Sequence, residues 1–137
     1  MTVVIDSSVL VAYCLKEKEH NIEKISEILR EGAISSDIII AESANAILIA
    51  NRRGLADRET AEKALDLANR LAKINLELAP HSESIKDVFD FAKKETKLTI
   101  YDALFIFLAK KTGSSLASFD EDQVKTAAKM GIKVIEI

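Results

Sequence analysis

The stretch VVIDSS, residues 3–8, decides the fold because it joins a buried strand directly to the start of a helix. Its first three residues form a β-branched apolar run, which is typical of a strand buried in a sheet. Asp6 ends that run, and Ser7 or Ser8 is predicted to cap a short helix that continues to Leu15. A strand followed at once by a helix indicates the first unit of an α/β protein.

The same alternation of strands and helices continues along the chain. Further strands are predicted at residues 33–35, 74–78, 115–119 and 132–137, and helices at about residues 22–31, 38–53, 57–72, 82–92, 99–112 and 120–130. Strands separated by helices run parallel and are covered on both faces. Because the sequence shows no repeat and no linker, we expect a single domain over residues 1–137, with three α/β/α layers and a central parallel sheet of about five strands.

The charge balance limits the partners that the chain can bind. Its 137 residues include 22 acids and 19 bases, so the formal net charge is −3. This excludes a strongly basic coat for nucleic acid, and a polyanion would have to be met by a local patch or through metal ions. The four glycines lie far apart, which excludes a P-loop and a glycine-rich dinucleotide loop.

Other features of the sequence argue against a zinc protein and a membrane protein. These features are the cysteine, the histidines and the apolar runs. Cys14, the only cysteine, lies in an apolar stretch and is expected to be a buried thiol in a reducing cytoplasm. His20 and His81 lie far apart in the sequence, which argues against a Cys/His zinc site. The longest wholly apolar run, residues 103–109, is too short to span a bilayer, which takes about 20 residues. No membrane association is therefore expected. No signal peptide is expected either, because the sequence starts directly as a strand with no basic region before it.

Four carboxylates fall in the most apolar parts of the chain. Asp6 and Asp120 each end a predicted strand, and Glu42 and Asp102 lie near the starts of predicted apolar helices. Strand ends and helix starts share one edge of a parallel sheet, so these acids are predicted to converge. Converging carboxylates repel one another unless a divalent cation neutralises them, and ligands that are all oxygen favour Mg²⁺ or Mn²⁺.

Helix capping is an alternative role for three of the acids. Asp6 could cap the helix that follows it, and Asp120 could form a capping box with Gln123. Asp102 could be the third residue of a capping box begun by Thr99. Glu42 has the weakest structural alternative, because an acid among isoleucines inside a helix is rarely structural. The two roles are compatible, since a metal ligand can also lie at the start of a helix.

At these positions the sequence resembles the PIN-domain family, in particular its VapC-type toxins. The motifs are VIDSSVLV at residues 4–11, AESANA at 41–46, YDAL at 101–104, SFD at 118–120 and the terminal strand GIKVI at 131–135. The first four resemble the family's opening strand with its first acid, its second acid with an Asn three residues later, its third acid, and the Ser/Thr-x-Asp motif that carries the fourth. The resemblance covers nearly the whole chain and keeps the family's order.

The resemblance implies a PIN-like fold and an endoribonuclease that cleaves RNA phosphodiesters with Mg²⁺ or Mn²⁺. It implies that Asp6 and Asp102 bind the metal directly, and that Glu42 and Asp120 bind a second ion or orient water. The residues implied to support these ligands or to contact phosphate are Ser8, Asn45 and Ser118. Asp122 is a further candidate acid, and its alternative is an ordinary solvated acid in the first turn of a helix.

The resemblance also implies a small antitoxin partner and a homodimer. Two other functions stay open, namely a catalytically silent PIN-like module that binds RNA or protein, and a nuclease of RNA maturation. The intact set of four acids argues against the silent module. A phosphohydrolase of the haloacid-dehalogenase type is disfavoured, because Ser8 stands where that chemistry needs a second Asp.

Contacts to RNA would come from local bases. The candidates are Arg52-Arg53, Lys93-Lys94-Lys97 and Lys110-Lys111. Each group also has an ordinary interpretation, as a solvated helix end whose charge suits the helix dipole. Tyr13 or Tyr101 could stack on a base, with packing as the alternative. The sequence does not specify an RNA target.

Overall fold

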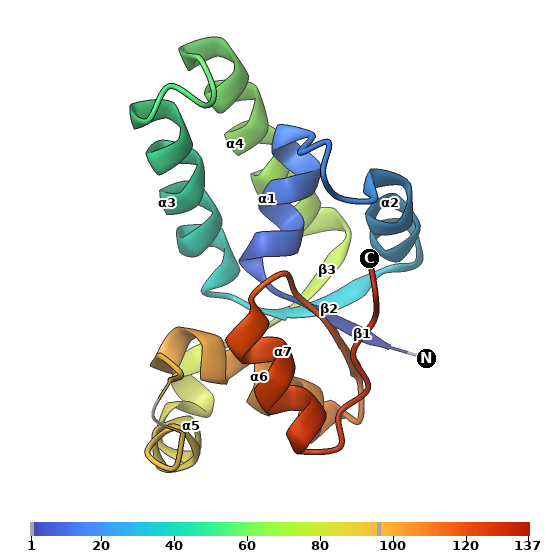
Figure 1. Cartoon of the computed structure of the whole chain (residues 1–137), viewed down its shortest axis with the longest axis vertical. Coiled ribbons are helices and arrows are strands. Elements are labelled where there is room, and N and C mark those ends of the chain that lie inside the picture. The colour runs from blue at the N-terminus through green and yellow to red at the C-terminus, as the bar shows by residue number, and fades with distance from the viewer. Residues whose placement is uncertain (1, 96) are drawn as a thin grey trace.

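The computed structural model describes residues 2–95 and 97–137, and its strands and helices follow the predicted order (Figure 1). The strands are β1 (Val3–Ile5), β2 (Ala33–Ser36), β3 (Leu76–Ala79) and β4 (Ser115–Ala117). The helices are α1 (Ser7–Leu15), α2 (Ile22–Glu31), α3 (Ile39–Arg52), α4 (Arg58–Ile74), α5 (Ile85–Ala92), α6 (Ile100–Thr112) and α7 (Glu121–Lys129), with a short 3₁₀ turn η1 (His81–Glu83) before α5.

The strands form a parallel sheet in the order β3-β2-β1-β4. Between β1 and β4 the register pairs Ile5 with Ala117. Asp6 and Ser118 are the next residues of the two strands, so the register leaves them side by side where both strands end. The predicted parallel sheet is thus confirmed, and its carboxyl edge brings together segments that lie more than a hundred residues apart in the sequence.

Helices cover the sheet on both sides (Figure 1). In this view α1, α3 and α4 lie above the strands and contact one another, while α5, α6 and α7 lie below them. Helix α6 contacts β1, β2 and β4, so it is the central helix of its layer. The three-layer architecture expected from the alternating elements is therefore present.

The centre of the core is built from apolar side chains of β1, α1 and α6. Ile5, Leu10 and Phe105 are among its largest fully buried members. Burial of Cys14 raises the pKa of its thiol to about 12, so the thiol stays protonated, as expected of a buried cysteine. Within residues 2–95 and 97–137, no helix combines the length and the apolar character needed to cross a membrane.

The structure corrects two predictions of local structure. Helix α1 is capped by Asp6, whose Oδ1 accepts from the amide of Val9, and not by Ser7 or Ser8. The segment 132–137 pairs with β4 through a single bridge, between Leu116 and Val134, so the described residues form a sheet of four strands instead of about five. The reason is the length of β4, which ends at Ala117 because the chain turns there toward α7.

Candidate functional site

Asp6 lies at the centre of the carboxyl edge and is almost fully buried, with 3% of its surface exposed. Its Oδ1 accepts hydrogen bonds from the hydroxyl of Ser8, at 2.6 Å, and from the amide of Val9, at 3.2 Å. Its Oδ2 accepts from the hydroxyl of Ser118. The sequence indicated two alternative roles for Asp6, and the structure shows that it does cap α1 while its carboxylate faces the strand ends.

Two serine hydroxyls connect Asp6 to the loop after β4. Ser8 Oγ accepts from the amide of Phe119 at 3.0 Å, and Ser118 Oγ accepts from the amide of Asp120 at 3.0 Å. Because each hydroxyl accepts from a backbone amide, its own proton is free to point at Asp6. The ends of β1 and β4 are therefore joined by one hydrogen-bonded network around a single carboxylate.

Burial raises the pKa of Asp6 to about 6, although the bonds from Ser118, Ser8 and Val9 favour the ionised form. The charge of Asp102 raises it further. A carboxylate that receives three hydrogen bonds and is still hard to ionise lies in a strongly desolvating, negatively charged place.

Glu42 enters the site from the first turn of α3. Its side chain is half-buried, and Oε1 accepts from the hydroxyl of Ser7 at 3.2 Å. Burial raises its pKa to about 7, and the charges of Asp102 and Asp6 act in the same direction. The electrostatic interaction with both aspartates places Glu42 in the same acidic cluster.

Asp102 lies in the first turn of α6, where its amide donates to Thr99 Oγ1 at 3.2 Å. This is one half of the capping box predicted for Thr99 and Asp102. The carboxylate also has a partner on α7, since Oδ1 accepts from Gln123 Nε2 at 3.4 Å. Burial raises the pKa of Asp102, as do the charges of Asp120 and Asp122, while the bonds from Thr99 and Gln123 lower it.

Asp120 caps α7, and its Oδ1 accepts from the amide of Gln123 at 2.9 Å. The predicted capping box is only half formed, because the Gln123 side chain turns to Asp102 instead of the Asp120 amide. Asp122 follows in the first turn of α7 and is exposed, but its charge reaches Asp102. Asn45 lies on α3 one turn after Glu42 and is exposed.

The four predicted acids thus face the same edge from four different segments and influence one another electrostatically. No three of these four acids have ligand atoms that all lie within 4.8 Å of one another, so they are less tightly packed than the ligands of one bound ion. Within residues 2–95 and 97–137, the group that does meet this distance is Glu17, Glu19 and His20. The roles predicted for the individual acids therefore remain predictions.

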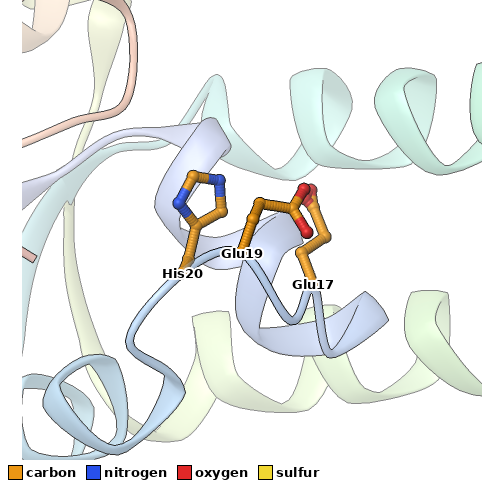
Figure 2. Close-up of side chains that lie close together, drawn as sticks. All are labelled: Glu17, Glu19 and His20. Atoms are coloured by element: carbon orange, nitrogen blue, oxygen red, sulfur yellow. The ribbon is translucent and has the colours of Figure 1, made fainter.

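The loop between α1 and α2 holds this second group of side chains, which could hold a metal ion (Figure 2). The Glu17 and Glu19 carboxylates meet there, and burial together with the charge of Glu19 raises the pKa of Glu17. The His20 ring stacks on Phe119, with centroids 3.6 Å apart. Sequence analysis missed this group, because the run of alternating charges around it is typical of a solvated loop.

The basic and aromatic candidates lie mainly at exposed helix ends. Arg52 and the pair Lys110-Lys111 lie in the last turns of α3 and α6, where their charges suit the helix dipole. Lys93 pairs with Asp90 at 3.5 Å, and its Nζ lies 5.6 Å from the centroid of the Phe89 ring. Tyr13 packs against the core, whereas Tyr101 is 54% exposed and beside Asp102 in sequence.

Comparison with known proteins gives consistent matches. The model of the PIN domain matches residues 3–129. Ribonuclease VapC3 of Pyrobaculum aerophilum is 31% identical over 121 residues, which cover 88% of this chain and 90% of that protein.

Two solved structures have a similar fold. VapC20 of Mycobacterium tuberculosis, described as a sarcin-ricin loop cleaving toxin, has a TM-score of 0.72 at 15% sequence identity. The match covers 99% of this chain and 100% of that chain. PAE2754 of P. aerophilum has a TM-score of 0.66 at 22% identity, covering 91% of this chain and 85% of that one.

Proposed function

Because the chain belongs to the PIN domain family, we propose that it is a divalent-metal-dependent endoribonuclease that cleaves RNA phosphodiesters. We propose further that it is the toxin of a VapBC-type toxin–antitoxin pair, with a small antitoxin as its partner. The similarity to a protein named as a VapC ribonuclease supports both proposals. A homodimer and a cytoplasmic location belong to the same proposal, and light scattering of the purified chain tests the dimer.

One observation carries the proposal. Asp6, Glu42 and Asp102 come from three elements, yet the charge of Asp102 raises the pKa of both other carboxyls. Asp102 itself is affected in the same way by Asp120. Bringing like charges together in a desolvated place costs free energy unless a cation binds there. An acidic edge of this kind is therefore best explained by a site for positive charge.

The donor set fits Mg²⁺ or Mn²⁺, since every candidate ligand is a carboxylate oxygen. We assign direct binding to Asp6 and Asp102, and binding of a second ion or orientation of water to Glu42 and Asp120. When bound, the ion supplies neutralising charge and lowers the pKa of water so that hydroxide forms near neutral pH. It would also let a chain with a net charge of −3 accept a polyanion.

The chain's own hydroxyls set the geometry of this site. Ser8 and Ser118 donate to opposite oxygens of Asp6, so they fix the plane of its carboxylate. Ser7 donates to Glu42 and restrains it in the same way. We assign support of the acids or contacts with the RNA phosphate to Ser8, Asn45 and Ser118, with Asp122 as an additional acid.

Cleavage of RNA by the purified chain tests the proposal directly. We expect cleavage with Mn²⁺ or Mg²⁺, loss of cleavage in EDTA, and a loss of at least about 100-fold in Asp6→Asn, because that variant removes a charge from the metal site. Asp87→Asn is the matched control, since Asp87 is an exposed acid in the first turn of α5. It should cleave like the wild type.

The result also separates the open alternatives. Equal cleavage by Asp6→Asn and wild type would refute the role of Asp6. A chain that neither cleaves RNA nor takes up Mn²⁺ in calorimetric titration would be the silent PIN-like module. Cleavage that trims precursor RNAs, without a co-purifying inhibitor, would favour the RNA-maturation nuclease.

A further inference from the structure

Gln123 is a polar side chain in a place where polar side chains are costly. It lies in α7, none of its surface is exposed, and it is among the largest fully buried side chains of the chain. A buried amide loses its hydrogen bonds to water and destabilises the fold unless other partners replace them. We therefore expect Gln123 to have a hydrogen-bond partner in the interior, to which an apolar side chain could not bind.

The partner is Asp102. Gln123 Nε2 lies 3.4 Å from Asp102 Oδ1, while the backbone amide of the same residue donates to Asp120 Oδ1 at 2.9 Å. A carboxylate only accepts hydrogen bonds, so the amide nitrogen is the end that must face Asp102. Gln123 thereby connects two of the acids, one at the start of α6 and one at the start of α7.

The other end of the amide has no hydrogen-bond partner among the residues that the structure describes. Gln123 Oε1 is buried and makes no hydrogen bond with any residue described in the structure. Buried acceptors of this kind are rare in folded proteins and are commonly satisfied by an ordered water. The unpartnered oxygen and the donor to Asp102 belong to one rigid amide, so the buried acceptor is held close to Asp102.

We propose that Gln123 is a positioning residue, which orients the Asp102 carboxylate for cation binding and accepts a hydrogen bond from a buried water molecule. The inference rests on the proposed function, since it gives Gln123 a role toward the cation that the acids would hold. The alternative is that Gln123 only fills space between α6 and α7. Partners that orient a metal ligand typically contribute 10–100-fold to metal affinity, which makes the two roles separable.

The first experiment uses the fact that Gln123 is the only glutamine of the chain. Selective labelling with ¹⁵N-glutamine gives one side-chain NH₂ signal. In metal-free protein, Asp102→Asn should shift this signal, because it changes the acceptor of Nε2, whereas Asp87→Asn should not. An unchanged signal in Asp102→Asn would overturn the inference, whatever the chain does with RNA.

The second experiment measures Mn²⁺ affinity by calorimetry in Gln123→Met, which keeps the size of the side chain and removes its hydrogen bonds. We expect roughly a 10-fold or greater loss of affinity. Asn75→Leu is the control, because Asn75 Nδ2 donates to Leu29 O at 2.9 Å at the opposite edge of the sheet. It should lower the melting temperature but leave the affinity unchanged.

The outcomes are distinguishable. If Gln123→Met melts lower but binds Mn²⁺ like the wild type, Gln123 only fills space and the inference fails, while the proposed function stands. If the wild type binds no Mn²⁺, the proposed function fails and this role of Gln123 fails with it. A loss of affinity without a comparable loss in Asn75→Leu supports the positioning role.

Discussion

Asp6 and Glu42 have pKa values of about 6 and about 7 in the folded chain, against ordinary values of 3.8 and 4.5. Between about pH 4 and pH 7 the folded state consequently binds more protons than the unfolded state. The free energy of unfolding then falls as the pH rises through this window, and the stability present below it is lost above it. In the absence of a cation, the acidic edge destabilises the chain at neutral pH.

Removing the Asp6 charge should therefore stabilise the metal-free protein. Asn caps a helix as well as Asp does, so Asp6→Asn keeps the start of α1. In EDTA at pH 8 we expect urea denaturation to give a free energy of unfolding higher than that of the wild type, by up to about 3 kcal/mol. Near pH 4 the difference should vanish. A variant that is less stable than the wild type by the same amount at both values would contradict this expectation.

Single residues could be predicted from the sequence where their context was unusual. Asp6, Glu42, Asp102 and Asp120 were conspicuous because they interrupt apolar segments, and the structure brings all four to one edge. Gln123 was interpretable only as a local capping partner, because its distance from Asp102 depends on how α6 and α7 pack. The spacing of residues in a sequence predicts contacts within one helix, but it does not predict contacts between two helices.

At the scale of elements, β1 and β2 are paired at one register position, Val4 with Ile34. Beyond it Ser35, which is fully buried, donates its hydroxyl to the carbonyl of Ile5 at 2.7 Å. A side chain thus satisfies the last carbonyl of β1, immediately before Asp6.

Loss of this hydrogen bond should destabilise the sheet. Ser35→Ala leaves a buried carbonyl without its partner, so we expect a decrease in the free energy of unfolding of about 1–3 kcal/mol in urea denaturation. Ser82→Ala, at an exposed position in η1, is the control and should change it little. Equal stability of the two variants would show that Ser35 is dispensable.

The order of the elements was predictable because strands and helices differ in the period of their apolar residues and because glycines end helices. Their exact ends were not, since Ser7 and Ser8 are as good caps in sequence as Asp6. The last strand was overestimated for a related reason. Its alternating pattern is real, but how far it pairs depends on where β4 stops.

At the scale of the whole molecule, one exposed apolar side chain lies next to a groove. Leu55 is 79% exposed just after α3, beside a groove between α1, α3 and α4 that is lined by Val11, Leu15, Ala46 and Ile49. Exposed apolar surface next to a groove is typical of a contact site for another protein. We expect the proposed antitoxin to bind there.

A charge at this site should separate partner binding from catalysis. We expect Leu55→Asp to lose a small protein that co-purifies with the wild type, and to cleave RNA at the wild-type rate. Ile74→Asp is the matched control, because Ile74 is 76% exposed at the other end of α4. Retention of the small protein by Leu55→Asp would place the partner elsewhere.

The network around Asp6 has one more consequence. The bonds from Ser8 and Val9 are local, but Ser118 reaches Asp6 only when β1 and β4 are paired, so the paired sheet completes the orientation of the carboxylate. A nascent or damaged copy of the chain would lack that geometry. The proposed nuclease would in this way gain a fully oriented Asp6 only once β4 has joined the sheet.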